Sequence, residues 1–128
     1  MGEKIAFQTE KAAICGTSFS QAIIYNKELI FISGQGSIDS ETNKPVHGTI
    51  EEETKRTLEN IRIVLEQAGS SLNKILQVNV YLSNIREYDM FNSIYVQYFE
   101  CDLPARSCIQ AAKIPFGLKV EIDAIAYI

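Results

Sequence analysis

Residues 49–82 read TIEEETKRTLENIRIVLEQAGSSLNKILQVNVYL, and the patterns in this stretch decide the fold. Thr49 begins a capping box, because its hydroxyl can accept a hydrogen bond from the third helical N–H while Glu52 reaches back to the cap. Gly69 is a natural left-handed stop. The apolar residues that recur between them at helical spacing are Leu58, Ile61, Val64, Leu65 and Ala68. This spacing predicts a helix over residues 50–68.

A strand and a second helix are predicted after the first helix. Residues 76–82 alternate with the period of a half-buried strand. The side chains that this alternation places on the buried face are Leu76, Val78, Val80 and Leu82. Residues 84–87 can cap a second helix that runs to about residue 100. Its apolar stripe, which we interpret as core packing, consists of Phe91, Ile94, Tyr95, Tyr98 and Phe99.

Strands are predicted on both sides of this central part. Two apolar runs at residues 22–25 and 29–32, with a short polar break between them, predict a β-hairpin. Residues 106–112 are expected to be extended, and residues 119–127 alternate strictly. The members of one face of this last strand are Val120, Ile122, Ala124 and Ala126.

The order of elements is therefore strands, helix, strand, helix, strands. It is typical of an α+β fold, a mixed β-sheet with two helices packed on one face, and we expect a single domain over residues 1–128. The opposite face of the sheet carries mixed rather than fully polar side chains. This favours a second copy of the chain as its cover.

Composition narrows the classes of function. The 128 residues carry a formal net charge of −4, which argues against a nucleic-acid binder that works through a general basic field. With one His and three Cys, a zinc site would have to draw on carboxylates or dispersed ligands, and we assign no metal. No apolar run approaches the ~20 residues of a membrane span, and we expect no membrane contact.

The cysteines and the start of the chain indicate a cytoplasmic protein. Cys15, Cys101 and Cys108 are irregularly spaced and form no CxxC pair, so we interpret them as free thiols in a reducing compartment. The first residues lack the apolar stretch of a signal peptide.

Arg106 and Glu121 are the residues most open to a chemical role. A guanidinium at the start of an otherwise apolar β segment is costly to bury unless it is paired. Its partner is either an internal carboxylate, for which Glu121 is the obvious candidate, or the carboxylate of a ligand, and composition alone favours the internal pair. Glu121 itself is a solvated edge charge, an ion-pair partner or a general base.

Two weaker signals lie in the first half of the chain. The segment 33–36, Ser-Gly-Gln-Gly, permits backbone N–H groups to approach a ligand, although such a segment is more often just a turn. His47 lies in a turn-rich stretch, and we expect it on the surface beside an exposed loop at residues 39–45.

Five segments together resemble the YjgF/RidA family of reactive-intermediate deaminases. FISGQ at 31–35 is similar to its (F)(V/I)SGQ segment, and TKRTLENIRIVLEQAG at 54–69 resembles its first helix. FNSIY at 91–95 is similar to its F-x-x-(V/M)N-x-x-Y helix. PARS at 104–107 and VEIDAIA at 120–126 match its PAR(S/T) and (V/I)EI(E/D)A(I)A motifs. The matches follow in the family's order over nearly the whole chain.

The resemblance implies a chorismate-mutase-like fold and a homotrimer with ligand sites in clefts between subunits. It also implies hydrolysis of 2-iminobutanoate and 2-iminopropanoate to 2-oxo acids and ammonia, without a cofactor. Arg106 would grip the substrate carboxylate, and Glu121 would orient or activate the attacking water. Backbone groups near Gly34 and Cys108 would hold the substrate, and Ser33 and Asn92 would line or support the cleft.

One departure from the family pattern concerns Phe19. The stretch TSFSQA at residues 17–22 stands where the family usually has Gly-Pro-Tyr-Ser-Gln-Ala, so the ring is retained and the phenol donor is lost. Either water or Ser18 supplies the hydrogen bond, or the activity is weaker or directed at another substrate. The alternative function is a non-enzymatic regulatory protein that binds a small carboxylate in the same cleft. A ribonuclease or chaperone role, also attached to this family, has no support in the acidic charge and single His.

Overall fold

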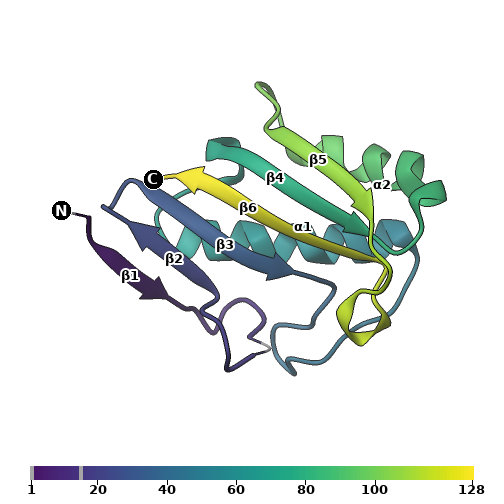
Figure 1. Ribbon diagram of the computed structural model, residues 1–128, viewed down its shortest axis with the longest axis horizontal. Coiled ribbons are helices and arrows are strands. Elements are labelled where there is room, and N and C mark those ends of the chain that lie inside the picture. Colours follow the sequence, from purple (N-terminus) through teal and green to yellow (C-terminus); the bar gives the residue numbers. More distant parts are fainter. Residues whose placement is uncertain (1, 15) are drawn as a thin grey trace.

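One mixed sheet and two helices build the computed structural model, which describes residues 2–14 and 16–128. The strands are β1 (Lys4–Phe7), β2 (Ala22–Tyr25), β3 (Leu29–Gln35), β4 (Ile75–Leu82), β5 (Ala105–Gln110) and β6 (Val120–Tyr127). The helices are α1 (Ile50–Gln67) and α2 (Tyr88–Tyr95). In Figure 1 both helices lie behind the sheet, on one of its faces.

The sheet has the order β1-β2-β3-β6-β4-β5. All neighbouring strands are antiparallel except β4 and β5, which run parallel because α2 crosses back between them. The predicted α+β class, with a mixed sheet and two helices on one face, is confirmed. The predicted free thiol of Cys15 falls outside the described residues.

Helix α1 begins and ends where its sequence signals place it. Thr49 Oγ1 accepts a hydrogen bond from the Glu52 amide (3.2 Å), and Glu52 Oε1 accepts one from the Thr49 amide (2.9 Å), so the capping box is complete. Gly69 follows the helix with φ +91°, which favours glycine. The apolar face of α1 packs on the sheet through residues that are almost fully buried: Ile50, Leu58, Ile61, Val64 and Leu65.

Two local predictions need correction, and one strand was not predicted. Leu76 was expected on the buried face, but it is 47% exposed because the register slips between Ile75 and Gln77. The second helix is shorter than predicted: α2 ends at Tyr95, and a single 3₁₀ turn follows over Val96–Tyr98. Strand β1 had no prediction, since its residues are mostly exposed and carry no burial pattern.

The face of the sheet away from the helices carries large apolar side chains in cross-strand rows. Phe31 is in register with Ile23 on one side and Ile125 on the other. Tyr25 and Tyr127 are both in register with Leu29. Phe31, Tyr25 and Tyr127 are each at least 40% exposed. We define these six residues as the open-face rows.

Among the described residues, no helix is long and apolar enough to cross a membrane.

Candidate active site

Strand β5 presents Arg106 to helix α2, where its guanidinium is held by neutral groups. Nη1 donates a hydrogen bond to Asn92 Oδ1 (2.8 Å), and Nη2 donates one to the Tyr88 hydroxyl (2.6 Å). The guanidinium carbon lies 4.6 Å from the centroid of the Tyr95 ring. The cation therefore rests in an aromatic and amide cradle that orients it without neutralising it.

The predicted internal ion pair between Arg106 and Glu121 is wrong. Strand β4 separates their two strands, and the two side chains leave opposite faces of the sheet. Arg106 is in register with Val78, which is buried under the helices, whereas Glu121 is in register with Tyr81, an odd number of residues further along β4. Within residues 2–14 and 16–128, no carboxylate forms an ion pair with Arg106.

Cys108 lies two residues after Arg106 on the same face of β5. It is in register with buried Val80 and packs against the main core, and its thiol is free. Burial raises the pKa of the Cys108 thiol, and the nearby Arg106 charge opposes this rise. The side chain is therefore a neutral thiol beside the guanidinium near pH 7.

Glu121 stands on the open face of β6, against Gly34 of β3. A Cβ atom at Gly34 would lie 2.6 Å from Glu121 Oε2, so only glycine leaves room for the carboxylate in this position. Burial raises the pKa of Glu121, and the negative charge of Asp123 raises it further. Glu121 is thus a carboxylate whose proton affinity is higher than that of an exposed glutamate.

A cavity of about 440 Å³ opens beside Glu121. Ser33 and Gly34 line it from β3, and Phe19 lines it from the segment before β2. The Ser33 hydroxyl donates a hydrogen bond to the carbonyl of Ser20 (2.6 Å), which ties the two segments together. The remaining lining residues include Ile38, Pro115, Phe116 and Leu118.

The residues implied by the family resemblance thus fall into two groups. We define the carboxylate half-site as Phe19, Ser33, Gly34 and Glu121, which line one cavity. We define the arginine half-site as Asn92 of α2 together with Arg106 and Cys108 on the facing side of β5. A single chain does not bring the two half-sites together.

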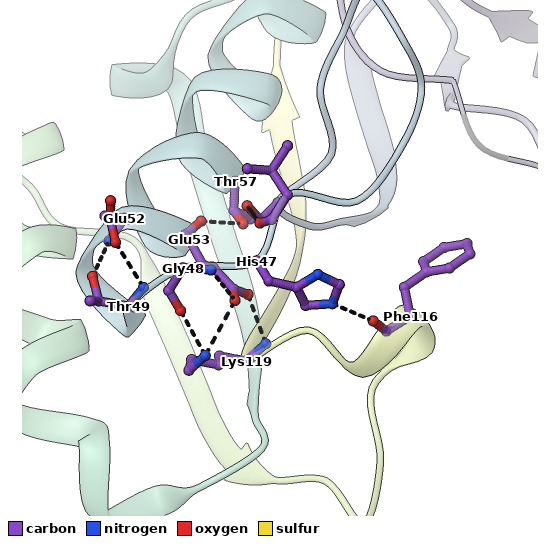
Figure 2. A network of polar contacts seen from close by, with 10 residues as sticks. His47, Gly48, Thr49, Glu52, Glu53, Thr57, Phe116 and Lys119 are labelled. Atoms are coloured by element: carbon purple, nitrogen blue, oxygen red, sulfur yellow. Dashed lines mark hydrogen bonds and ion pairs between the residues drawn. The ribbon is translucent and has the colours of Figure 1, made fainter.

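A buried carboxylate fixes the wall of the cavity from behind. Figure 2 shows Glu53 of α1 between two backbone amides, that of Gly48 (3.2 Å) and that of Lys119 (2.8 Å). Glu53 is fully buried, and the ammonium of Lys119 lies 3.7 Å from its carboxylate. His47 reaches the same wall, since its Nε2 lies 2.8 Å from the carbonyl oxygen of Phe116. His47 is exposed, as predicted.

Comparison with known proteins agrees with this architecture. A family model described as Endoribonuclease L-PSP matches residues 9–128. A RutC family protein of Pyrococcus abyssi is 41% identical, with 99% of this chain and 98% of that protein covered. The human 2-iminobutanoate/2-iminopropanoate deaminase is 36% identical, with 92% and 85% covered. A crystal structure of the Rid-family protein YyfA from Yersinia pestis superposes with a TM-score of 0.93 at 35% identity, covering 98% of this chain and all of that one.

The chain belongs to the YjgF/RidA family.

The sequence of this YjgF/RidA chain did not predict that several further residues lie beside the two half-sites. Tyr88 and Glu53 carry no local motif, and Tyr95 was expected only to pack in the core. Phe116 lies between a proline and a glycine, and that turn signal was the only available clue to its unusual backbone. The contacts of these residues depend on which strands become neighbours, which a single sequence does not state.

A metal site would need several ligating side chains close together in this YjgF/RidA chain. Within the described part of the molecule, no three His, Cys, Asp or Glu side chains are grouped closely enough to hold a metal ion.

Proposed function

We propose that this protein is a 2-iminobutanoate/2-iminopropanoate deaminase, which hydrolyses reactive 2-imino acids to 2-oxo acids and ammonia. The observation that carries the proposal is the state of Arg106, a part-buried guanidinium oriented by Asn92 and Tyr88 with neutral partners only. Such a cation is prepared for an external carboxylate, which every 2-imino acid carries. The kinship with deaminases of that name in rat and human supports the same substrate class.

In this proposal Arg106 holds the substrate and leaves C2 free to react. The carboxylate of the imino acid binds the guanidinium, and backbone groups near Gly34 and Cys108 restrain the rest of the molecule. Binding a small anion in one orientation lowers the entropic cost of the reaction. An iminium carbon is already electrophilic, so the site needs an anion clamp and one placed water.

Glu121 accepts the proton of that water. The water oxygen forms a bond to C2, the C=N electron pair moves to nitrogen, and Glu121 takes the released proton. Glu121 then returns the proton to the amino group and the C–N bond breaks. The hydroxyl gives its proton to the departing ammonia, so that the 2-oxo acid forms, the nitrogen leaves as ammonium and Glu121 is again a carboxylate. A carboxylate with a raised pKa is suited to both transfers, because it accepts a proton more readily than an exposed glutamate does.

The two half-sites meet, in this proposal, between subunits of a homotrimer. Arg106 and Glu121 leave opposite faces of the sheet, so the arginine half-site of one copy must approach the carboxylate half-site of the next. The open-face rows supply apolar surface for such an assembly. Closed rings built from one repeated contact are a common solution for identical chains.

We also propose a cytoplasmic location and a reaction without a cofactor. Cys101 and Cys108 are both free thiols, which fits a reducing compartment. The chemistry above uses only the substrate, water and side chains of this chain.

The test is imine decay with and without the protein. An amino acid oxidase generates 2-iminobutanoate from L-2-aminobutyrate, and the protein should accelerate its disappearance. Arg106→Ala should lower kcat/KM about 10²–10³-fold through loss of the carboxylate clamp. Equal rates for wild type and Arg106→Ala would remove the proposal.

Phe19 is the observation that favours the alternative function, a non-enzymatic regulatory protein that binds a small carboxylate in the same cleft. The family's usual phenol is absent from the cavity, and a non-enzymatic protein that binds small carboxylates needs no such donor. Saturable binding of 2-oxobutanoate in calorimetry without turnover would favour that alternative. If the missing phenol limits turnover instead, Phe19→Tyr should raise kcat, and an unchanged kcat would dismiss this explanation.

A further inference from the structure

Arg106 shares one of its terminal nitrogens with the phenol of Tyr88. Nη2 donates a hydrogen bond to the Tyr88 hydroxyl (2.6 Å), and Nη1 donates one to Asn92 Oδ1 (2.8 Å). A guanidinium has five N–H donors, and within the described part of the chain the other three have no hydrogen-bond partner. The donors that remain for a ligand are therefore the Nε–H and one hydrogen on each terminal nitrogen.

A carboxylate that binds Arg106 through two parallel N–H groups must use Nη2. One edge of the guanidinium offers Nε and Nη2, and the other edge offers Nη1 and Nη2. The ligand is therefore bound next to the phenol of Tyr88, whichever edge it takes. This juxtaposition lies within one chain, so it does not depend on how a second copy closes the site.

Tyr88 is held in place by more than this hydrogen bond. Tyr88, Asn92 and Tyr95 follow one another at helical spacing, so they share the face of α2 that meets Arg106 of β5. The Tyr88 ring packs against the main core, and the guanidinium carbon of Arg106 lies 5.5 Å from its centroid. The hydroxyl is thus fixed beside Nη2 before a ligand arrives.

The Tyr88 phenol still has its own proton to donate. Its oxygen accepts a hydrogen bond from Arg106, and its O–H has no acceptor within residues 2–14 and 16–128. Two acceptors on the same Arg106 nitrogen lie about 4.5–5 Å apart, because the two N–H bonds diverge by about 120°. This separation is too long for a hydrogen bond from Tyr88 to the carboxylate itself. The atom bonded to C2 lies one carbon further along the ligand, which brings it within reach of the hydroxyl.

Resting on the proposed deaminase function, we propose that Tyr88 is a further catalytic residue, whose O–H donates a hydrogen bond to the atom doubly bonded to C2. That atom is the nitrogen of the neutral imine in the substrate and the 2-oxo oxygen in the product. As water adds to C2, the C=N electron pair moves to nitrogen, and the hydrogen bond to this nitrogen strengthens. Tyr88 keeps its proton throughout, and Glu121 remains the residue that transfers protons.

Binding of 2-oxobutanoate and of butanoate separates a direct contact from an effect through Arg106. Both ligands carry the carboxylate, but only 2-oxobutanoate has an oxygen doubly bonded to C2. Tyr88→Phe keeps the ring and removes the hydroxyl, so it should raise the Kd of 2-oxobutanoate about 5–10-fold in an NMR titration, as the loss of one hydrogen bond does. The Kd of butanoate should change less than about twofold, because butanoate offers the phenol no acceptor at C2. An equal change for both ligands, or no change for either, would overturn the inference.

Turnover of 2-iminobutanoate provides the second test. Tyr88→Phe should lower kcat at least about tenfold with a smaller rise in KM, because the hydrogen bond is stronger in the transition state than in the bound substrate. Tyr98→Phe is the matched control, since Tyr98 lies in the 3₁₀ turn after α2 and its ring is also partly buried against the main core. This control should keep the wild-type kcat and KM. Wild-type kinetics in Tyr88→Phe would overturn the inference.

The two tests distinguish failure of this inference from failure of the deaminase proposal. If the wild type hydrolyses no imine while Tyr88→Phe weakens the binding of 2-oxobutanoate alone, the deaminase proposal fails and the phenol stands as a ligand donor. If the wild type and Tyr88→Phe hydrolyse 2-iminobutanoate at equal rates, the inference fails and the deaminase proposal stands. A wild-type protein that binds neither ligand and hydrolyses no imine would overturn both.

Discussion

At Gly34, an added methyl group would meet Glu121 before any other part of the protein. The three atoms nearest to a Cβ at this position all belong to the Glu121 side chain. Gly34 does not have a positive φ, so an alanine there keeps the backbone and displaces the carboxylate. In the proposed mechanism Gly34 therefore positions Glu121, because the absence of a side chain leaves room for the carboxylate.

Gly34→Ala should lower kcat/KM about 10–100-fold, since a displacement of about 1 Å at a reacting group costs that much. The thermal unfolding midpoint should change little, because the flexible carboxylate moves and the fold does not. Steady-state kinetics on 2-iminobutanoate together with a melting curve separate the two effects. An alanine variant with wild-type kcat/KM would show that the position of Glu121 does not matter.

Glu121→Gln should cost at least about 10²-fold in kcat while it stabilises the fold above neutral pH. The folded-state pKa of Glu121 is raised above its ordinary value, so the wild type loses stability as pH rises through that raised pKa. The glutamine variant lacks this loss, and the two proteins should unfold alike below pH 4. Melting curves at pH 4 and pH 8 test the sign. A glutamine variant that is less stable than wild type at pH 8 would contradict a raised pKa.

The helices and strands differ in how well their local sequence predicts them. Helix α1 follows from its capping box and its apolar spacing, and β6 follows from strict alternation, because both signals are local. The outward turn of Leu76 depends on a register slip against β6, which no local pattern records. The ion pair between Arg106 and Glu121 was mispredicted for the same reason, since residue types indicate charge but not the face from which a side chain leaves.

Element packing also explains how the cavity wall is held. Glu53 of α1 fixes the chain before β6 through the Lys119 amide and the loop before α1 through the Gly48 amide. Removal of this carboxylate leaves two amides without their acceptor in a buried place, whereas the Lys119 ammonium is 37% exposed and still donates a hydrogen bond to the Gly48 carbonyl oxygen (2.6 Å). The wall residues Pro115 and Phe116 lie a few residues before Lys119, so their position depends on this contact.

Glu53→Ala should lower the free energy of unfolding by about 2–4 kcal/mol, because two buried amides lose their acceptor and each unsatisfied group costs about 1–3 kcal/mol. Glu53→Gln keeps one acceptor oxygen and should cost less. Denaturant titrations of both variants provide the measurement. KM for 2-iminobutanoate should rise more than kcat falls, because the wall and not the reacting groups is disturbed. An alanine variant with the wild-type free energy of unfolding would show that the buried contact does not stabilise the fold.

At the scale of the whole molecule, two features indicate an assembly of several copies. The open-face rows expose Phe31 between Ile23 and Ile125, and the two half-sites lie on opposite faces of one sheet. A monomer explains neither feature, whereas an assembly of copies covers the rows and joins the half-sites.

Phe31→Asp should convert the protein to monomers and abolish turnover without unfolding it. A carboxylate in the middle of an apolar contact must be desolvated without a partner, which disfavours association by several kcal/mol. Sedimentation velocity and circular dichroism test assembly and folding separately. Met90→Asp on the exposed side of α2 serves as the control and should remain assembled. An active Phe31→Asp monomer would contradict the shared site.

Complementation between two inactive variants tests the shared site most directly. Arg106→Ala and Glu121→Gln are unfolded and refolded together, so that mixed assemblies form. If each site takes Arg106 from one copy and Glu121 from the next, about a quarter of the sites in a random equal mixture are intact, and about a quarter of the wild-type activity should return. Each variant refolded alone should stay inactive. A refolded mixture that is proven to contain mixed assemblies and yet shows no activity above the separate variants would contradict a site shared between copies.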